Sequence, residues 1–557
     1  MDRVTPIPRR EVGPADTVFL PEKSPIERRM VVVVFLLSFL YLYIFRRYTT
    51  MEPDEGIVLE GAQRVLRGEI LYRDFFSFFT PGSYYFLAMI FRVFGNSFTV
   101  ARIVLLVFGS CYSVLAYLLA RRVCSRSIAV LATALMAATT LPFRFLVLHN
   151  WDSTLWACLA VYCSVRSLES PNWKWPLAVG SFTSLTFLFE QSKGAGLGLG
   201  LGVGLLIVAL ASPSKPRFST PQLSGFAFGL LWPFVLVLAY FAAHHAVGVM
   251  AADWVWPLQH YSAANRVPYG YQNWSDETRN QLFGTGSLFV RVVTIATMSP
   301  CFLIPLFPLI AAGLGVHRTV SIFQRKSDGS KNEYYVVVCA ALSGLLLSVI
   351  LVRADIIHFV YLQPLFCLVF AWIFEAHDIP GWLPRNLRGA VVLCLVLAFS
   401  LFSIPLLIRA TTVSNSLTTR KGLVNTPRKD AVIPYVQNHV TEGELMLVYP
   451  YLPLYQYLSA TSGPSSFEYF QAGMNTSEQA QTMISQLASR RVRVVLFESS
   501  FVQKIPNSWP HTELRAIVND PVADYILREY RNCKVLISTN DWRFLFMVRK
   551  DLPCPEN

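Results

Sequence analysis

Residues 100–120 read VARIVLLVFGSCYSVLAYLLA, a stretch of twenty-one residues in which Arg102 is the only charged side chain. An α-helix needs about 20 mostly apolar residues to cross the hydrocarbon core of a bilayer. Further stretches of near-spanning length recur along the chain, at 30–45, 127–142, 153–168, 175–190, 194–211, 223–243, 288–315, 334–352, 356–376 and 389–408. The pattern predicts a polytopic α-helical membrane protein with about 11 transmembrane helices.

The composition of the 557 residues agrees with this interpretation. Hydrophobic residues make up 53% of the chain and charged residues only 15%, whereas soluble proteins carry roughly 25% charged residues. An ordinary soluble enzyme, a disordered scaffold and a receptor with a single anchor are therefore excluded. The net charge of +13 is expected of a membrane protein with basic cytoplasmic loops beside anionic lipids, so we expect no nucleic-acid partner.

The distribution of Lys and Arg predicts the topology. With the N-terminus in the cytoplasm, the inner segments carry 19 basic residues and the outer ones 11, although Arg46 and Arg47 oppose this bias locally. We expect a cytoplasmic tail at 1–29, a transmembrane domain at 30–410 and an extracytoplasmic domain at 411–557. The expected location is a bacterial inner membrane, with the endoplasmic reticulum as the open alternative. The outer loop 46–99 contains an apolar segment, residues 83–94, that is too short to span and is expected to form a helix that lies at the membrane surface or is partly re-entrant.

The chain changes character from about residue 411. Helical patterns at 427–440, 477–490 and 521–530 alternate with strand-like runs at 445–449, 492–497, 534–538 and 543–549. This alternation predicts a small α/β domain. Cys533 and Cys554 fall in this domain and are able to pair if it faces an oxidising compartment. The other eight cysteines lie in or beside apolar segments and form no CxxC pair.

Polar clusters occur at span boundaries, and all four lie on the predicted outer side. They are Glu52-Pro53-Asp54-Glu55, Arg144 with His149-Asn150-Trp151-Asp152, Glu190-Gln191-Ser192-Lys193, and Arg353-Ala354-Asp355-Ile356-Ile357-His358. Ionisable groups near membrane depth are energetically costly, so their default interpretation is functional. We expect the four clusters to converge on one site.

Each cluster also has a purely structural interpretation. Acids at 52–55 precede an amphipathic helix that ends at Gly68, and the helix dipole alone favours acids in a first turn. Lys193 is long enough to snorkel to the interface. His149 and His358 are compatible with ordinary boundary histidines, and Arg353, Asp355 and His358 with a salt bridge in a loop.

Two further patterns leave alternatives open. Glycine recurs at every second position from Gly194 to Gly204, which is typical of close helix packing and less so of a groove for a lipid chain. The predicted outer loop 244–287 is rich in aromatic residues, which form either an interfacial belt or a surface for stacking sugar rings. These residues are Trp254, Trp256, Tyr261, Tyr269, Tyr271 and Trp274.

The stretch from Pro53 to Arg102 is the most specific part of the sequence. It contains Pro53-Asp54-Glu55-Gly56, Tyr72-Arg73-Asp74-Phe75, Thr80-Pro81-Gly82-Ser83-Tyr84-Tyr85, Phe94-Gly95 and Ala101-Arg102. In order and spacing it resembles the first outer loop of the GT-C superfamily of membrane glycosyltransferases, which use polyprenyl-phosphate sugars. That superfamily includes protein O-mannosyltransferases, lipid A aminoarabinose transferases and rhizobial lipopolysaccharide galacturonosyltransferases.

The resemblance implies roles for individual residues. Asp54 would be the catalytic base or the carboxylate that positions the acceptor, and Glu55 would support it. The segment from Glu190 to Gly194 looks like a lysine-bearing stretch of the superfamily, although relatives often place the lysine where Glu190 stands, which puts the role of Lys193 in doubt. The segment from Arg353 to His358 is similar to a late outer-loop motif with Arg, Asp and His in that order.

The chemistry of sugar transfer fits these residue types independently. A base must take a proton from the acceptor hydroxyl or amine, and we assign this role to Asp54 in a single inverting displacement. The leaving polyprenyl phosphate is already acidic, so cations that stabilise its charge suffice; the candidates are Arg353, Lys193, His358, His149 and Arg102. Candidates for binding the sugar or the acceptor are Asp152, Asp355, Tyr84, Trp256 and Tyr261. No cofactor is predicted; a divalent metal that bridges carboxylate and phosphate stays open, because no full ligand set can be read from the sequence.

The sequence thus predicts a glycosyltransferase with a polyprenyl-phosphate sugar as donor, a glycolipid, glycan or protein as acceptor, and membrane lipids as partners. Two other functions compete with it. A transporter or flippase for a lipid-linked substrate would carry internal repeats, interrupted spans in corresponding halves and charges near mid-membrane, and the sequence has no visible repeat. A catalytically inactive membrane scaffold is the second alternative.

Overall fold

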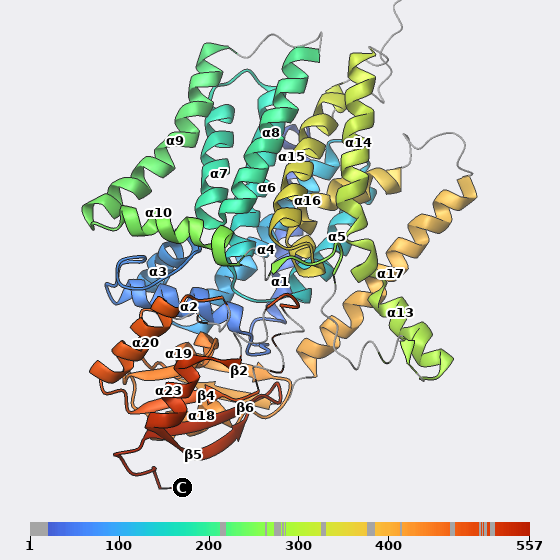
Figure 1. Ribbon diagram of the computed structural model, residues 1–557. Coiled ribbons are helices and arrows are strands. Elements are labelled where there is room, and N and C mark those ends of the chain that lie inside the picture. The colour runs from blue at the N-terminus through green and yellow to red at the C-terminus, as the bar shows by residue number, and fades with distance from the viewer. Residues whose placement is uncertain are drawn as a thin grey trace, which may run out of the picture.

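The apolar stretches form long helices in the computed structural model, which describes residues 20–556 apart from 212–218, 262–264, 272–279, 281–282, 285, 325–329, 376–384, 413–414, 468–469, 471–473, 501–502, 504, 506–508 and 513–517. Residues 1–19 of the predicted cytoplasmic tail and Trp274 of the aromatic loop lie outside the described residues. Figure 1 shows a bundle of long helices at one end of the molecule and the C-terminal domain at the other.

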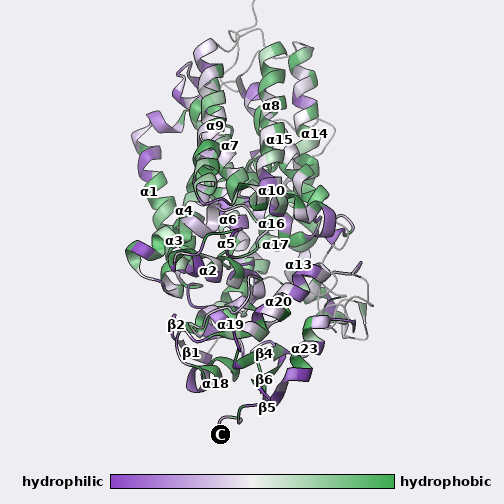
Figure 2. Cartoon of the chain, turned by 60° about the vertical axis from the view of Figure 1, so that its left-hand side comes forward, coloured by the Kyte–Doolittle hydropathy of each residue, from purple (hydrophilic) through white to green (hydrophobic). Residues whose placement is uncertain are grey.

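The bundle is built from helices that follow the predicted spans. Their bounds are α1 Pro25–Tyr43, α4 Phe98–Arg121, α5 Arg126–Phe143, α6 His149–Glu169, α7 Lys174–Phe189, α8 Gln191–Ala211, α9 Thr220–Ala243, α14 Leu306–Phe323, α15 Ser330–Val352, α16 Ile356–Glu375 and α17 Arg385–Thr411. Within the described ranges, eight helices are long and apolar enough to cross a membrane, namely α4, α5, α8, α9 and α14 to α17. The multi-pass helical fold is therefore confirmed, and the count of about eleven spans stays a prediction. In Figure 2 hydrophobic residues dominate α8 and α14, as lipid-facing helices require.

One predicted span was wrong. The stretch 288–315 is not a single helix but two, α13 Leu288–Leu303 and α14, which are separated at Ile304-Pro305. Proline lacks the backbone N–H that a continuous helix would use there. The two helices have different main neighbours, since α13 packs on α17 and α14 packs on α15.

The loop 46–99, which is predicted to be the first outer loop, lies between the bundle and the C-terminal domain (Figure 1). It contains two short helices, α2 Pro53–Leu66 and α3 Gly82–Phe94. Pro53 occupies the first turn of α2, where its missing N–H is harmless, and α3 ends at Gly95, whose φ of 93° suits glycine. The short helix expected at 83–94 is thus confirmed, and α2 presents the Asp54-Glu55 pair in its first turn.

Helix α8 packs closely on α15 through its glycines. A Cβ atom built on Gly196 would lie 2.3 Å from the carbonyl oxygen of Gly344, and one on Gly200 would lie 2.3 Å from that of Ala340. Gly202, on another face, has no atom within 4 Å of such a Cβ. Gly194 in turn faces α7, where a Cβ atom would lie 2.3 Å from the backbone of Phe187. The alternating glycines therefore serve close packing on α15 and, at the start of α8, on α7.

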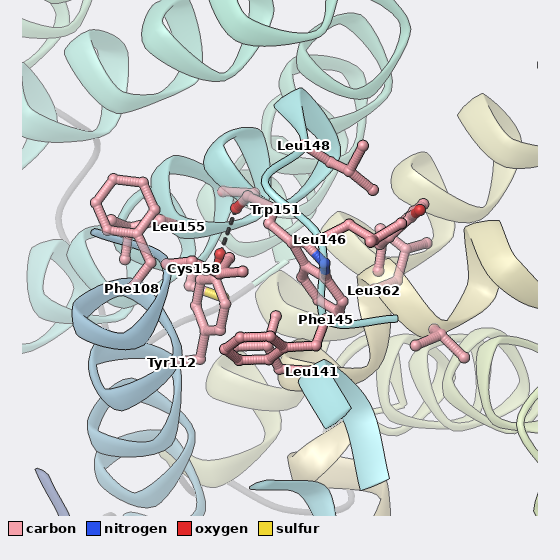
Figure 3. Close-up of a cluster of buried hydrophobic side chains, with 14 of the residues drawn as sticks. Phe108, Tyr112, Leu141, Phe145, Leu146, Leu148, Trp151, Leu155, Cys158 and Leu362 are labelled. Carbon is pink, nitrogen blue, oxygen red and sulfur yellow. Dashed lines mark hydrogen bonds between the residues drawn. The ribbon is translucent and has the colours of Figure 1, made fainter. Parts of the chain in front are cut away.

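A hydrophobic cluster supports the segment that joins α5 to α6 (Figure 3). Phe145, Leu146 and Leu148 of this segment are buried with Trp151, and Tyr112 of α4 donates a hydrogen bond to the carbonyl of Trp151. Burial of each large apolar side chain contributes about 1.5–3 kcal/mol. The cluster fixes the backbone directly after Arg144.

The C-terminal domain is a small α/β unit, as predicted. Its four-stranded sheet has the order β3-β4-β6-β5, in which only the β3–β4 pair is parallel. The bounds are β3 Met446–Tyr449, β4 Val494–Glu498, β5 Tyr530–Ile537, β6 Arg543–Arg549, α18 Val432–His439, α19 Pro453–Leu458, α20 Ser477–Ser489 and α23 Pro521–Glu529. The structure adds a hairpin that the sequence interpretation missed, β1 Asn415–Thr419 and β2 Gly422–Thr426. Cys533 and Cys554 form a disulfide.

Candidate active site

Asp54 and Glu55 are adjacent in sequence but lie in opposite environments. Successive residues of an α-helix point about 100° apart, so Asp54 faces outward from the first turn of α2 while Glu55 faces the bundle. The Asp54 side chain is 44% exposed, and the Glu55 side chain is completely buried. Of the two predicted acids, Asp54 is therefore the one that a substrate is able to reach.

Two side chains from distant parts of the chain hold the Asp54 carboxylate. Arg144 donates from Nη2 to Oδ2 at 2.7 Å, and the Tyr451 hydroxyl donates to Oδ1 at 2.5 Å. Arg144 also pairs with Glu52 at 2.6 Å and donates from Nε to the Tyr361 hydroxyl at 2.8 Å. An ionised carboxylate has roughly four acceptor positions, so Asp54 keeps acceptor capacity on its exposed side.

Glu55 binds groups that shape the site and does not itself reach the solvent. Its Oε2 accepts from Arg102 at 2.7 Å, and its Oε1 accepts from the backbone N–H of Val147 at 3.0 Å. Arg102 is fully buried and also donates to the carbonyl of Phe145. Burial raises the pKa of Glu55, against the lowering effect of Arg102 and the Val147 N–H. These contacts favour a positioning role for both Glu55 and Arg102.

Tyr361 of α16 connects the remaining clusters. Its ring lies 5.8 Å from the Lys193 Nζ, and its centroid lies 6.0 Å from that of His358 and 4.9 Å from that of Trp151. His149 interacts electrostatically with Asp54, Glu190, Lys193 and His358. The structure therefore brings the four polar clusters together around Tyr361 and His149.

Lys193 is buried, and its ammonium group has a dense set of partners. Its Nζ lies 2.9 Å from Glu190 Oε2 and donates to the Asn150 carbonyl and the Ser153 hydroxyl, both at 2.8 Å, and to Thr154 at 3.1 Å. An ammonium group has three donors. Lys193 would have to give up bonds at the start of α6 to bind a phosphate directly.

The late cluster forms a network centred on Asp355. Its carboxylate accepts from Arg353 Nε at 2.5 Å and lies 2.7 Å from His358 Nδ1, and it caps α16 by accepting the His358 N–H at 3.0 Å. Arg353 also donates to Asn265 at 3.0 Å. Burial acts to raise the pKa of Asp355, but His358 and Arg353 outweigh it and hold that pKa well below its usual range. The loop salt bridge is thus present, and it orients the ring of His358, which is 25% exposed.

The predicted sugar-binding residues fall into two groups. Asp152 accepts from the Ser83 hydroxyl at 2.6 Å, and the Tyr84 hydroxyl lies 3.1 Å from that of Ser77. Trp256 and Tyr261 join an aromatic wall, which consists of Phe76, Phe78, Phe79, Trp256 and Tyr261.

The aromatic wall reaches the charged site. The rings of Phe78 and Trp256 are stacked with centroids 5.4 Å apart, and Phe79 lies 4.2 Å from His149. Trp256 ends α10 Val247–Trp256, a helix that crosses the end of the bundle (Figure 1). Sugar rings stack on such apolar surfaces.

Three residues of the site carried no assigned role at the sequence level. Arg144 was visible as a member of a polar cluster, but its partners were not. Tyr361 lies one helical turn after His358, so it shares the face of the predicted motif. Tyr451 is 397 residues from Asp54, and no sequence signal connects them. Within the described residues, no group of three or more His, Cys, Asp and Glu side chains is arranged to hold a metal ion.

The comparisons with known proteins concern the fold and one part of the sequence. Residues 80–240 match the family model of dolichyl-phosphate-mannose-protein mannosyltransferases. ArnT from Cupriavidus metallidurans, with undecaprenyl phosphate bound, has a similar fold with a TM-score of 0.54 at 12% sequence identity, over 95% of this chain and 99% of ArnT. The Archaeoglobus fulgidus oligosaccharyltransferase gives a TM-score of 0.49 at 12% identity, over 92% of this chain and 73% of that chain. No curated protein sequence matches this chain.

The match over residues 80–240 and the ArnT-like fold both support the GT-C interpretation of the sequence. The chain has the fold of a multi-pass membrane protein with a small C-terminal sheet domain.

Proposed function

We propose that the protein transfers a sugar from a polyprenyl-phosphate donor to a hydroxyl or amine of a glycolipid, glycan or protein. The observation that carries this proposal is Asp54, a half-exposed carboxylate at the centre of converging cations. The undecaprenyl phosphate bound to ArnT supports a lipid phosphate as the leaving group.

In the proposed reaction Asp54 accepts the proton of the acceptor as the acceptor atom attacks the anomeric carbon. The bond to the donor phosphate breaks in the same step, and the anomeric configuration inverts. General-base catalysis of this kind contributes roughly 10²–10⁴-fold to the rate. A divalent metal, if present, would add further positive charge near the leaving phosphate.

The phosphate is stabilised by the positive side of the site. Arg144 lies 2.7 Å from Asp54, and His149 interacts electrostatically with both Asp54 and His358. Arg353, Lys193 and Arg102 are engaged by Asp355, Glu190 and Glu55, respectively. We propose that these three cations mainly hold the site in shape and add to its positive field.

The aromatic wall is the proposed surface for the sugar or acceptor, with Trp256 and Tyr261 as its stacking residues. Asp152 and Tyr84 bond to serines of the first outer loop, which favours a supporting role. Asp355 likewise acts through Arg353 and His358.

The site is proposed to face the extracytoplasmic side of an inner membrane, with the tail 1–29 in the cytoplasm and the domain 411–557 outside. The Lys and Arg bias supports this orientation. The Cys533–Cys554 disulfide supports it independently, because disulfides persist in oxidising compartments.

The decisive experiment uses purified protein in lipid nanodiscs with a panel of labelled polyprenyl-phosphate sugars and measures release of polyprenyl phosphate. Asp54→Asn is expected to lower release by about 10²–10⁴-fold. Asp74→Asn is the matched control, because Asp74 lies in the same loop and pairs with Arg73 at 2.8 Å; it should keep the wild-type rate.

Two outcomes would overturn the proposal. The first is release by Asp54→Asn at the wild-type rate. The second is tight binding of a lipid or solute with no release from any donor, which would favour a transporter or a scaffold.

A further inference from the structure

The segment that carries the site acids, residues 47–54, is held by the C-terminal domain. Asn425 at the edge of β2 donates its N–H to the carbonyl of Arg47 at 2.7 Å and accepts the N–H of Thr49 at 3.0 Å. Asn540, from the turn before β6, donates to the carbonyl of Thr50. The segment therefore pairs with the domain as an added strand would, along residues 47–50, directly before Met51 and Glu52.

The same domain contacts the end of this segment through Tyr451. The hydroxyl of Tyr451 donates to Asp54 Oδ1 at 2.5 Å, and the buried tyrosine ring packs edge-on against Trp509 with centroids 6.4 Å apart. A hydrogen bond to an ionised carboxylate is shorter and stronger than one between neutral groups. Tyr451 thus occupies one oxygen of Asp54 while Arg144 occupies the other.

The C-terminal domain contacts the backbone of α2 directly. A Cβ atom on Gly56 would lie 2.1 Å from the backbone nitrogen of Leu454, at the start of α19. Only glycine allows this approach. The distance between the α2 backbone and the loop that carries Tyr451 is therefore set by direct backbone contact.

We infer that Tyr451 is a positioning residue for Asp54, so that the C-terminal domain forms part of the active site. The inference rests on the proposed function in taking Asp54 as the base. Tyr451 on Oδ1 and Arg144 on Oδ2 fix the rotation of the carboxylate, which directs its remaining lone pairs toward the exposed side. The orientation of a base relative to the acceptor proton strongly affects the rate of transfer.

The kinetic test compares Tyr451→Phe with Tyr457→Phe in the full-length protein. Tyr457 is the matched control, because it lies in α19 and donates to Asn96 of the membrane domain at 3.1 Å without contacting Asp54. Tyr451→Phe should lower kcat about 10- to 100-fold, the range expected for a lost hydrogen bond to a charged group, with the KM for the donor changed less than about twofold. Tyr457→Phe should leave kcat unchanged.

A second test does not depend on transfer. A water-soluble carbodiimide attaches to an oxygen of a carboxyl group, and the hydrogen bond from Tyr451 covers Oδ1 of Asp54. In Tyr451→Phe the labelling of Asp54 at a fixed pH, followed by mass spectrometry, should therefore be faster than in the wild type or in Tyr457→Phe.

The two tests separate failure of the inference from failure of the proposed function. If the wild type transfers no sugar, the proposed function fails and the labelling of Asp54 still decides the role of Tyr451. Unchanged labelling in Tyr451→Phe would overturn the inference, as would equal kinetic losses in the two tyrosine variants.

Discussion

The helix bundle carries a cluster of ion pairs at each end, and the paired carboxylate of Glu27 is buried at one end whereas that of Asp54 is partly exposed at the other. At the end formed by the start of α1 and the ends of α4 and α6, Glu27 is almost completely buried and pairs with Arg121 at 3.0 Å and Arg126 at 2.8 Å. At the other end Asp54 pairs with Arg144 at 2.7 Å but keeps nearly half of its side chain exposed.

The arginines of the two ends form a matched pair. Arg122 holds Glu22 at 2.6 Å and Glu169 at 2.7 Å, much as Arg144 holds Glu52 and Asp54. A cluster of ionisable residues is therefore not in itself evidence of a catalytic site. The distinguishing feature is an acid that is both oriented by its partners and open to a substrate.

The largest expected effect tests the end of the bundle that carries the buried Glu27. Arg122→Gln leaves two carboxylates short of their buried partner, and breaking a buried pair in this way costs about 3 kcal/mol of unfolding free energy. Thermal unfolding in detergent should show a clearly lower midpoint, while transfer per folded molecule stays near the wild-type rate. A loss of transfer in molecules that remain folded would contradict the assignment of this end as structural.

The next effect tests the end that carries the exposed Asp54, again by replacing an arginine with glutamine. Arg144→Gln removes the guanidinium that orients Asp54, and we expect kcat to fall about 100-fold, as for loss of one electrostatic contact in an active site. The unfolding midpoint should change little, because the Glu52 and Asp54 side chains are partly exposed. A destabilised protein with normal kcat would reverse the comparison of the two ends.

Much of the fold could be predicted because long apolar runs fix the helices whatever their neighbours are. The break at Pro305 and the β1–β2 hairpin were missed although each has a local signal. Pro300, Pro305 and Pro308 interrupt the helical pattern, and Lys421-Gly422 marks the hairpin turn, where Gly422 has a φ of 119°.

The candidate site likewise has features that could be predicted from the sequence and features that could not. The four polar clusters were visible because each lies at a span boundary on one side, but the partner of each charge depends on packing. Arg102 and Lys193 look like free cations in the sequence and are buried against Glu55 and Glu190 in the structure. The contact of Tyr451 with Asp54 could not be predicted from the sequence, because it requires the whole C-terminal domain to be docked.

A smaller effect concerns the scaffold between the two ends. A Cβ atom on Gly344 would lie 2.0 Å from the carbonyl oxygen of Gly196, so Gly344→Ala forces α15 away from α8 and should lower the unfolding free energy by about 1–3 kcal/mol. Gly202→Ala is the control, because its new Cβ meets no atom within 4 Å. Its helix should be stabilised slightly, by up to about 1 kcal/mol. Equal unfolding midpoints for the two variants would show that α8 and α15 are not in close contact.

The smallest effect, measured over one pH unit, concerns a third kind of carboxylate, one without a cation. Asp253 of α10 is buried, and its Oδ2 has no hydrogen-bond partner among the described residues. Burial raises the pKa of Asp253 to about 7, so the folded protein keeps a proton that the unfolded chain loses near pH 4. The contribution of Asp253 to stability should then be fully present below pH 4 and fall by about 1 kcal/mol per pH unit up to pH 7.

Thermal unfolding between pH 5 and 8 tests this expectation against Asp253→Asn, which is isosteric and does not titrate. The unfolding midpoint of the wild type should fall relative to that of the variant as the pH rises to 7. Above that pH the difference between the two midpoints should stay constant, because Asp253 is then ionised in both the folded and the unfolded protein. Parallel curves for the two proteins would mean that Asp253 is charged throughout. Asp253 would then need a partner besides the backbone N–H of Ser77, and the end of the bundle that carries Asp54 would compensate the charge of all its acids, as the opposite end does.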